Sequence, residues 1–150
     1  HLCLWCPELN LFISGDQILP RISSNVSVFP TEPEADPLND WLDSCARLKR
    51  EIPAGALVLP AHNEPFTGAH HRLQDLIDGH EKAMDRVEQR LREGPCLAVD
   101  LFPALFPRNI SGDLLGFATG EALAHLNCLI QRGRARRTTT AAGVWLYETV

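Results

Sequence analysis

The chain has 150 residues, of which 45% are hydrophobic and 22% charged, and its formal net charge is −5. This composition is typical of a globular protein with a packed core and excludes wholesale disorder. The negative charge gives no general electrostatic reason to bind nucleic acid, and no apolar run approaches the roughly 20 residues that span a bilayer. Five cysteines without a disulfide-framework spacing favour free thiols, so we expect a cytoplasmic protein that does not enter membranes.

The first part of the chain predicts a pair of strands followed by a long loop. Residues 2–6 and 11–14 are apolar runs separated by a Pro- and Asn-containing turn, so we expect a hairpin whose first strand is buried. Residues 17–36 contain three prolines and several Ser and Asn residues. We therefore expect that segment to be mostly loop.

Two helices and a strand are predicted next. Asp36 followed by Pro37 is typical of a helix start, and the apolar spacing of that helix continues to Ile52. The wholly apolar run 56–59 predicts a short strand buried on both faces. Residues 69–93 form the longest predicted helix, and its apolar face contains Leu73, Leu76, Ile77, His80, Met84, Val87 and Leu91.

Gly94 and Pro95 end that helix and mark the predicted domain boundary, with one domain at 1–94 and a second at 95–150. The second domain is predicted to contain short helical segments and then a β-ribbon. In chain order, these are a helix near 96–105, a helical turn at 112–116, a helix capped by Thr119 and ended by Gly133, and strands at 136–140 and 144–147. This order is the outline of a winged helix.

Two residues of metal-binding type follow predicted strands. Asp16 comes just after the strand at 11–14, and His62 just after the strand at 56–59. Ligands of open α/β sheets collect outside the carboxyl ends of the strands, and both residue types bind zinc. Taken one at a time, a Gly-Asp pair at a strand end is more often a turn, and a loop histidine is more often a surface residue.

The segments around Asp16 and His62 resemble the metallo-β-lactamase superfamily. Residues 12–22 (FISGDQILPRI) are similar to the family's strand, G-D and loop segment, and residues 57–66 (LVLPAHNEPF) to its V-L-P-G-H-G-x-P segment. The resemblance implies that Asp16 bridges two zinc ions and that His62 binds the second. Ala61 and Asn63 stand where the family usually has glycine.

The resemblance covers nearly the whole chain and implies its fold and activity. The expected architecture is α/β, with 1–94 as the C-terminal half of an αββα sandwich and 95–150 as an appended winged-helix-like module. The implied activity is zinc-dependent hydrolysis by metal-activated water, with a small-molecule ester, thioester, lactone or phosphodiester as substrate. Some members of the family cleave RNA.

The family's H-x-H-x-D-H ligand cluster is absent, and the sequence begins at His1 rather than methionine. We therefore expect a C-terminal fragment of a dinuclear zinc enzyme. His1 resembles the second histidine of a family G-H-x-x-x-H segment, whose ligand is usually the first. With two ligands remaining, the fragment is expected to bind zinc weakly or not at all, to be inactive, and to expose an apolar face where the missing half packs.

Three further residues are candidates for the substrate pocket. Ser24 and Asn25 follow Asp16 and either line the pocket or hold their loop by local hydrogen bonds. His80 lies on the apolar face of the long helix and either packs in the core or supports the pocket.

A second class of function stays open for the C-terminal module. Arg134 and Arg136, together with Arg132 and Arg137, form a basic cluster where a winged helix places its wing. One interpretation is a non-catalytic module that binds nucleic acid or a protein. The other is a solvated basic face, or a cap over the active site or a neighbouring subunit in a homodimer.

Overall fold

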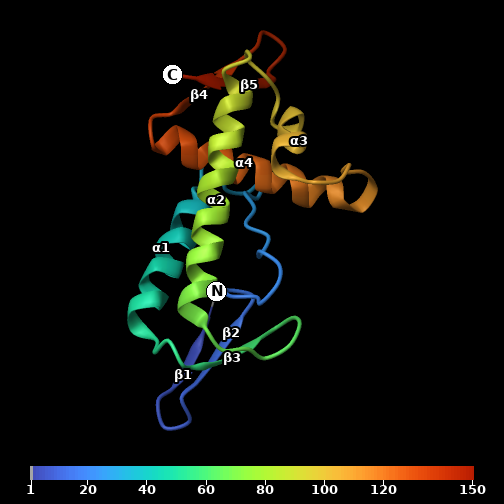
Figure 1. Cartoon of the computed structure of the whole chain (residues 1–150). Helices are drawn as coiled ribbons and strands as arrows, with labels where there is room; N and C mark the ends of the chain where they lie inside the picture. Colours follow the sequence, from blue (N-terminus) through green and yellow to red (C-terminus); the bar gives the residue numbers. More distant parts are fainter. Residues whose placement is uncertain (1) are drawn as a thin grey trace. The chain divides into compact units, whose positions relative to one another are not determined.

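The computed structural model describes residues 2–150 and has a mixed α/β fold, as predicted (Figure 1). Its contacts divide the chain into two compact units. The first unit comprises the residues up to Ser24 together with 41–79, and the second comprises 25–40 and 80–150. Two long helices, α1 (Pro37–Glu51) and α2 (Ala69–Leu91), contribute residues to both units.

The first unit contains a three-stranded sheet in the order β1 (Leu4–Cys6), β2 (Leu11–Gly15) and β3 (Leu57–Pro60). Strand β1 pairs with β2 antiparallel, which confirms the predicted hairpin, and β2 pairs with β3 parallel. Asn10 closes the hairpin with a positive φ of 48°, and its side-chain amide donates to the carbonyl oxygen of Gly55 at 3.0 Å. The sheet is therefore mixed, with β2 in the centre.

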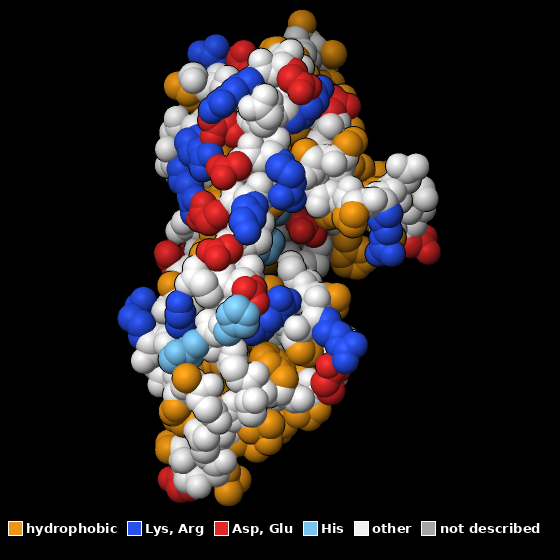
Figure 2. Space-filling view, in the orientation of Figure 1, with side chains coloured by type: hydrophobic (Ala, Val, Ile, Leu, Met, Phe, Trp, Pro, Cys, Tyr) orange, Lys and Arg blue, Asp and Glu red, His pale blue; other side chains and the backbone are white. Residues whose placement is uncertain are grey.

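The two faces of this sheet differ in exposure because alternate residues of a strand point to opposite sides. On one face Phe12 is 2% exposed and Val58 is fully buried. On the other face Leu4, Ile13 and Leu57 are 55%, 43% and 39% exposed. The predictions that the first strand and the strand at 56–59 are buried are therefore wrong for this face. Figure 2 shows hydrophobic side chains, in orange, at the surface of the lower part of the view, where Figure 1 places β1, β2 and β3.

The helices of the first unit cover the buried face. Asp36 caps α1 as predicted, because its Oδ1 accepts the backbone N–H of Asn39 at 3.1 Å. Within the first unit, Lys49 of α1 donates to the side chain of Gln74 of α2 at 2.6 Å, so the two helices are neighbours there. The apolar residues that pack from these helices include Cys45, Leu48, Leu73 and Leu76.

The second unit is built around the most apolar helix, α4 (Leu115–Gln131). Before it come the 3-10 turns η1 (Ala98–Leu101) and η2 (Gly112–Leu114) and the short helix α3 (Phe102–Leu105). After it, β4 (Ala135–Thr139) and β5 (Trp145–Thr149) form an antiparallel hairpin, as predicted. The core residues contributed by this unit include Met84, Val87, Leu101, Leu126, Leu129 and Tyr147.

Two local features of α4 are its start and its close contact with the segment before α1. The helix begins at Leu115, directly after η2, so the prediction that Thr119 caps it is wrong: the Thr119 hydroxyl donates inside the helix to the carbonyl oxygen of Leu115 at 2.8 Å. The extended segment before α1 crosses α4 at Gly120, where Val28 N–H donates to the Gly120 carbonyl oxygen at 3.0 Å. A Cβ at Gly120 would lie 2.8 Å from the Cβ of Ser27, so only glycine fits this crossing.

The compact units do not coincide with the predicted domains. The contacts separate α2 after Gly79, whereas the predicted domains are 1–94 and 95–150, and that boundary stays a prediction. Helices α3 and α4 and the β4–β5 hairpin follow the predicted order, but this order alone does not establish a winged helix. Within residues 2–150, no helix has both the length and the apolar character needed to cross a membrane.

Candidate metal centre

The fold of the first unit brings Asp16 and His62 into contact. Strands β2 and β3 are parallel neighbours, so their carboxyl ends meet at the same edge of the sheet, where Gly15 is paired with Pro60. Asp16 directly follows β2, and His62 lies two residues after β3. The Nδ1 atom of His62 is 2.7 Å from Oδ1 of Asp16.

This contact defines the chemistry of the pair. An ionised carboxylate can only accept, so Nδ1 of His62 carries the proton that is shared with Asp16. In the neutral imidazole the lone pair is then on Nε2, the nitrogen that can bind a metal. The side chains of His62 and Asp16 are 65% and 44% exposed. A ligand in solution can therefore reach both.

The loop that carries His62 is anchored on both sides. At its start, Ala61 N–H donates to the carbonyl oxygen of Gly15 at 3.0 Å, which continues the pairing of the two strands. At its end, Phe66 pairs with Val58 through backbone hydrogen bonds of 2.8 and 3.1 Å. The loop is thus a short turn that folds back onto β3, and Asn63 within it has a positive φ of 68°.

The loop that carries Asp16 is held by side chains that donate to its backbone. The hydroxyl of Ser14, which is fully buried, donates to the carbonyl oxygen of Ile18 at 2.9 Å. The hydroxyl of Ser24 donates to the carbonyl oxygen of Asp16. Ser24, a predicted pocket residue, therefore lies in the first unit and stabilises the backbone of the candidate ligand.

Arginine side chains that the sequence interpretation did not select also contact these loops. Arg72, on the first turns of α2, donates through Nε to the carbonyl oxygen of Leu19 at 2.7 Å and through Nη2 to that of Ile22 at 2.8 Å. Arg21 donates through Nε and Nη2 to Glu64, at 2.8 and 2.6 Å, and so links the two loops at the surface. Proximity in sequence to Asp16 and His62 was the only signal for Arg21 and Glu64.

The pair fits a zinc site in kind and in position but not in number. An imidazole and a carboxylate at 2.7 Å are donors that zinc accepts, whereas catalytic zinc usually has three protein ligands and a water. Within residues 2–150 no group of three or more His, Cys, Asp or Glu side chains could hold a metal ion. The candidate His1 lies outside the described residues.

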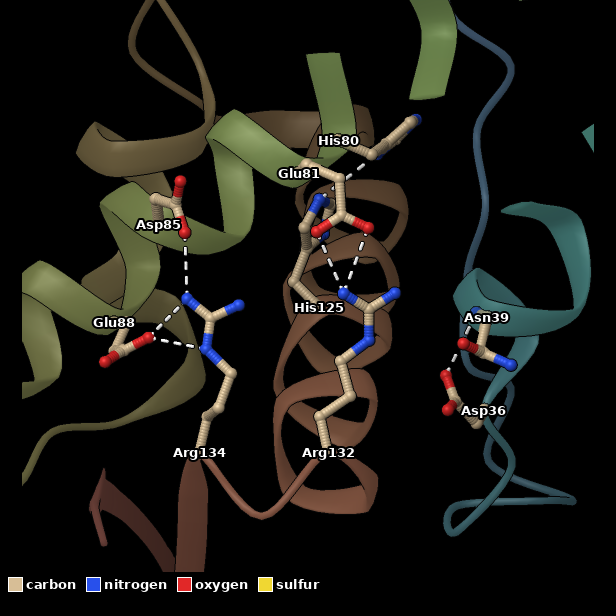
Figure 3. A network of polar contacts seen from close by, with 9 residues as sticks. All are labelled: Asp36, Asn39, His80, Glu81, Asp85, Glu88, His125, Arg132 and Arg134. Carbon is tan, nitrogen blue, oxygen red and sulfur yellow. Dashed lines mark hydrogen bonds and ion pairs between the residues drawn. The ribbon is translucent and has the colours of Figure 1, made fainter. Parts of the chain in front are cut away.

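The predicted pocket residues Asn25 and His80 belong to the second unit. The side-chain amide of Asn25 donates to a carboxylate oxygen of Glu121 at 3.0 Å. His80 is 5% exposed, and its Nδ1 is 3.3 Å from Nε2 of the buried His125, with 5.3 Å between the ring centroids (Figure 3). Burial lowers the pKa of His80 to about 4, and His125 adds to the shift. His80 is therefore a neutral core residue at pH 7.

The four arginines of the basic cluster each contact a carboxylate in the second unit. Arg132 donates to Glu81 at 2.9 Å, and Arg134 donates to Glu88 at 2.7 Å and to Asp85 at 2.8 Å (Figure 3). In the same way Arg136 contacts Glu148, and Arg137 contacts Glu34. Acidic and basic side chains are interspersed over this surface rather than separated (Figure 2).

Helix α4, which precedes the basic cluster, is largely buried. His125 and Asn127 of α4 are 1% and 4% exposed. The side-chain amide of Asn127 donates to the carbonyl oxygens of Pro33 and Ala35 at 2.9 and 2.8 Å. These polar residues therefore stabilise the packing of α4 rather than facing a partner.

The chain is similar to known proteins over nearly its whole length. Residues 84–150 match the family described as metallo-beta-lactamase-like, C-terminal domain. The chain is similar to a β-lactamase domain protein from Burkholderia ambifaria, with 40% sequence identity over 93% of this chain and 41% of that one and a TM-score of 0.88. It is also similar to a metallo-beta-lactamase family protein from Thermus thermophilus, with 29% identity over 95% of this chain and 43% of that one and a TM-score of 0.78.

The chain spans about two fifths of the length of these two solved structures. No curated protein matches it.

Proposed function

Because the chain belongs to the metallo-β-lactamase superfamily, whose members are generally hydrolases, we propose that it is the C-terminal part of a metal-dependent hydrolase. Asp16 and His62 are two ligands of its proposed dinuclear zinc centre. The observation that supports this assignment is the 2.7 Å contact between Oδ1 of Asp16 and Nδ1 of His62, at the carboxyl ends of adjacent parallel strands.

The remaining ligands belong, in this proposal, to residues that precede the chain in a longer parent protein. The matched relatives are more than twice as long as the chain, which is consistent with a missing segment of that kind. The chain alone then binds zinc weakly and is inactive, because two protein ligands rarely hold catalytic zinc.

The exposed face of the sheet supports the same architecture. Leu4, Ile13 and Leu57 form an apolar surface that a second sheet would cover, as in the αββα sandwich proposed for 1–94 and the missing half. For 95–150 we propose the winged-helix-like module, because helices α3 and α4 precede the β4–β5 hairpin.

In the complete protein, bound zinc would lower the pKa of a water molecule and polarise a carbonyl or phosphoryl oxygen. Asp16 and His62 would hold the metal: the carboxylate would supply negative charge, and the imidazole would supply a neutral nitrogen donor. The substrate classes that we propose are small esters, thioesters, lactones and phosphodiesters.

Zinc retention tests the proposal directly. After dialysis against a mild chelator, the full-length protein is expected to retain two zinc ions per chain, as a dinuclear site requires. The 150-residue chain is expected to retain none, because residues 2–150 contain no group of three possible ligands. Metal content is measured by mass spectrometry of the dialysed proteins.

The matched variants are Asp16→Ala and His62→Ala in the full-length protein, with His71→Ala as the control because the His71 side chain is 87% exposed. Both ligand variants are expected to lose zinc, and the control to keep it. Full zinc retention by Asp16→Ala, or stoichiometric zinc in the 150-residue chain, would contradict the proposal.

The alternative function is a module that binds nucleic acid or protein through the basic cluster. Its test is the salt dependence of oligonucleotide binding. The affinity falls steeply as salt concentration rises when arginines release counterions from phosphates. Because Arg134 and Arg136 already contact carboxylates, we expect weak binding that Arg134→Ala with Arg136→Ala leaves unchanged. Tight binding that both substitutions abolish would favour the binding module over the hydrolase.

A further inference from the structure

We propose that Arg72 is a positioning residue that holds the loop carrying Asp16 against the helix that follows the loop carrying His62. The inference rests on the proposed function, because it assigns a role in shaping the same metal site. It concerns the first unit alone, to which Arg72, Asp16 and His62 all belong.

The guanidinium of Arg72 contacts the Asp16 loop at two points. Its Nε donates to the carbonyl oxygen of Leu19 at 2.7 Å, and its Nη2 donates to that of Ile22 at 2.8 Å. Because the group is planar and rigid, two such bonds fix both the distance and the orientation of the loop relative to α2. A single donor would fix only one point.

Helix α2 is itself joined closely to the His62 loop. Phe66 pairs with Val58 of β3, and α2 begins three residues later at Ala69, which is fully buried. The backbone N–H of Arg72 donates to the carbonyl oxygen of Gly68 at 3.1 Å. Backbone contacts therefore join the His62 loop to the start of α2, and Arg72 connects that segment to the Asp16 loop.

Burial distinguishes Arg72 from the other arginine that links the two loops. Arg72 is half-buried, and burial lowers the pKa of its guanidinium from the usual value, although Asp75 opposes that shift. Bonds from a partly desolvated cation to carbonyl oxygens are stronger than those at the surface. In contrast, the side chains of Arg21 and Glu64 are 69% and 50% exposed, and surface ion pairs of that kind contribute little.

The loop has other anchors, so loss of Arg72 need not unfold the protein. Ile18 and Leu19 are 0% and 3% exposed and hold the loop in the core. What Arg72 adds is the fixed position of the stretch from Leu19 to Ile22, just after the candidate ligand. Substitution is therefore expected to loosen the Asp16–His62 geometry more than the fold.

The test uses Co²⁺ as a spectroscopic probe in the full-length protein. Arg72→Gln removes the charge and the double contact, and it is expected to weaken Co²⁺ affinity about tenfold or more, as loss of groups that orient ligands commonly does. The visible absorption of bound Co²⁺ is expected to change shape, because the ligand geometry changes. Arg72→Lys keeps the charge but presents one nitrogen, and we expect an intermediate loss of about threefold or more.

Arg47→Gln is the matched control, because Arg47 lies on α1 in the first unit, its side chain is 62% exposed, and it contacts Glu51 only at 3.9 Å. Its Co²⁺ affinity and spectrum are expected to match the wild type. Wild-type affinity and spectrum in Arg72→Gln would overturn the proposal. If that variant does not fold, wild-type behaviour of Arg72→Lys would overturn it instead.

A metal-free measurement separates this inference from the proposed function. In the wild type, hydrogen bonding to Asp16 keeps the proton of His62 on Nδ1, which long-range ¹H–¹⁵N correlations detect in protein with labelled histidine. Arg72→Gln is expected to give a mixture of tautomers, and a single Nδ1–H tautomer would count against the positioning role. If the wild type binds no Co²⁺ and its His62 tautomer still differs from that of Arg72→Gln, the metal site is refuted and the positioning role of Arg72 stands.

Discussion

Asp16→Asn in the full-length protein is expected to lower kcat/KM for hydrolysis by at least about a hundredfold. Loss of a residue that only hydrogen-bonds to a metal ligand costs up to about a hundredfold, and a direct ligand should matter at least as much. Asparagine has nearly the shape of aspartate and can still accept a hydrogen bond from Nδ1 of His62, now 2.7 Å from Oδ1 of Asp16. In the proposed metal centre it would lack the negative charge that Asp16 would supply to the bound cations. The experiment measures steady-state hydrolysis together with bound zinc.

The matched control for this prediction is Asp43→Asn, because Asp43 is an exposed carboxylate on α1 in the same compact unit. It removes the same charge elsewhere and is expected to leave kcat/KM unchanged. Hydrolysis by Asp16→Asn at the wild-type rate, with zinc retained, would remove Asp16 from the site.

The sequence predicted the long helices well because their signals are local. The start of α1 depends on the Asp36 side chain and on Pro37, both of which act within one turn. The apolar face of α2 is periodic over about five turns. His80 lies on that face and is buried, in agreement with one of its two interpretations. Thr119 misled the prediction because a capping residue type can also bond back to the carbonyl four residues earlier.

The candidate site was only partly predictable. Asp16 and His62 were selected because each follows a strand, but their contact depends on β2 and β3 being parallel neighbours, a fact of tertiary structure. Arg72 could not be selected, because its partners are backbone carbonyls of Leu19 and Ile22, about 50 positions earlier. No residue type marks those acceptors in the sequence.

The charge environment of the basic cluster also depends on tertiary contacts that the sequence does not show. Arg132 and Arg134 form a visible run in the sequence, whereas their partners Glu81 and Glu88 lie on α2, far from them along the chain. Charge density along a sequence therefore overstates the positive field of a folded surface whenever tertiary packing brings carboxylates alongside.

Acidification is expected to destabilise the chain by about 3 kcal/mol through His80 alone. Its pKa is 6.5 in the unfolded chain and about 4 in the fold, because burial and the neighbouring His125 disfavour the charged imidazole. As pH falls from 6.5 to 4, His80 becomes protonated in the unfolded state but stays neutral in the folded state. The free energy of unfolding therefore decreases between these pH values, and His80 lowers it no further below pH 4. Burial lowers the pKa of His125 as well, which adds to the loss.

Hydrogen bonds fix the arrangement of the two neutral rings, whereas burial is the main reason that they resist protonation. Nδ1 of His125 is 2.8 Å from the carbonyl oxygen of Glu121 and must donate to it, so Nε2 of the neutral ring accepts from Nδ1 of His80 at 3.3 Å. A second proton on His125, at Nε2, would place an N–H group directly against the Nδ1–H group of His80. Glu121 offsets part of the loss near pH 4.5, since burial raises the pKa of its carboxyl and the fold binds that proton first.

Guanidinium denaturation at a series of pH values, followed by far-ultraviolet circular dichroism, measures this loss. His80→Gln keeps a donor toward His125 but cannot take up a proton, so it is expected to remove most of the decrease between pH 6.5 and 4. His71→Gln is the control, because it removes a histidine from the same helix whose side chain is 87% exposed. Equal stability at pH 7 and pH 4 in the wild type, or an unchanged slope in His80→Gln, would show that the histidine pair does not set the acid limit of the fold.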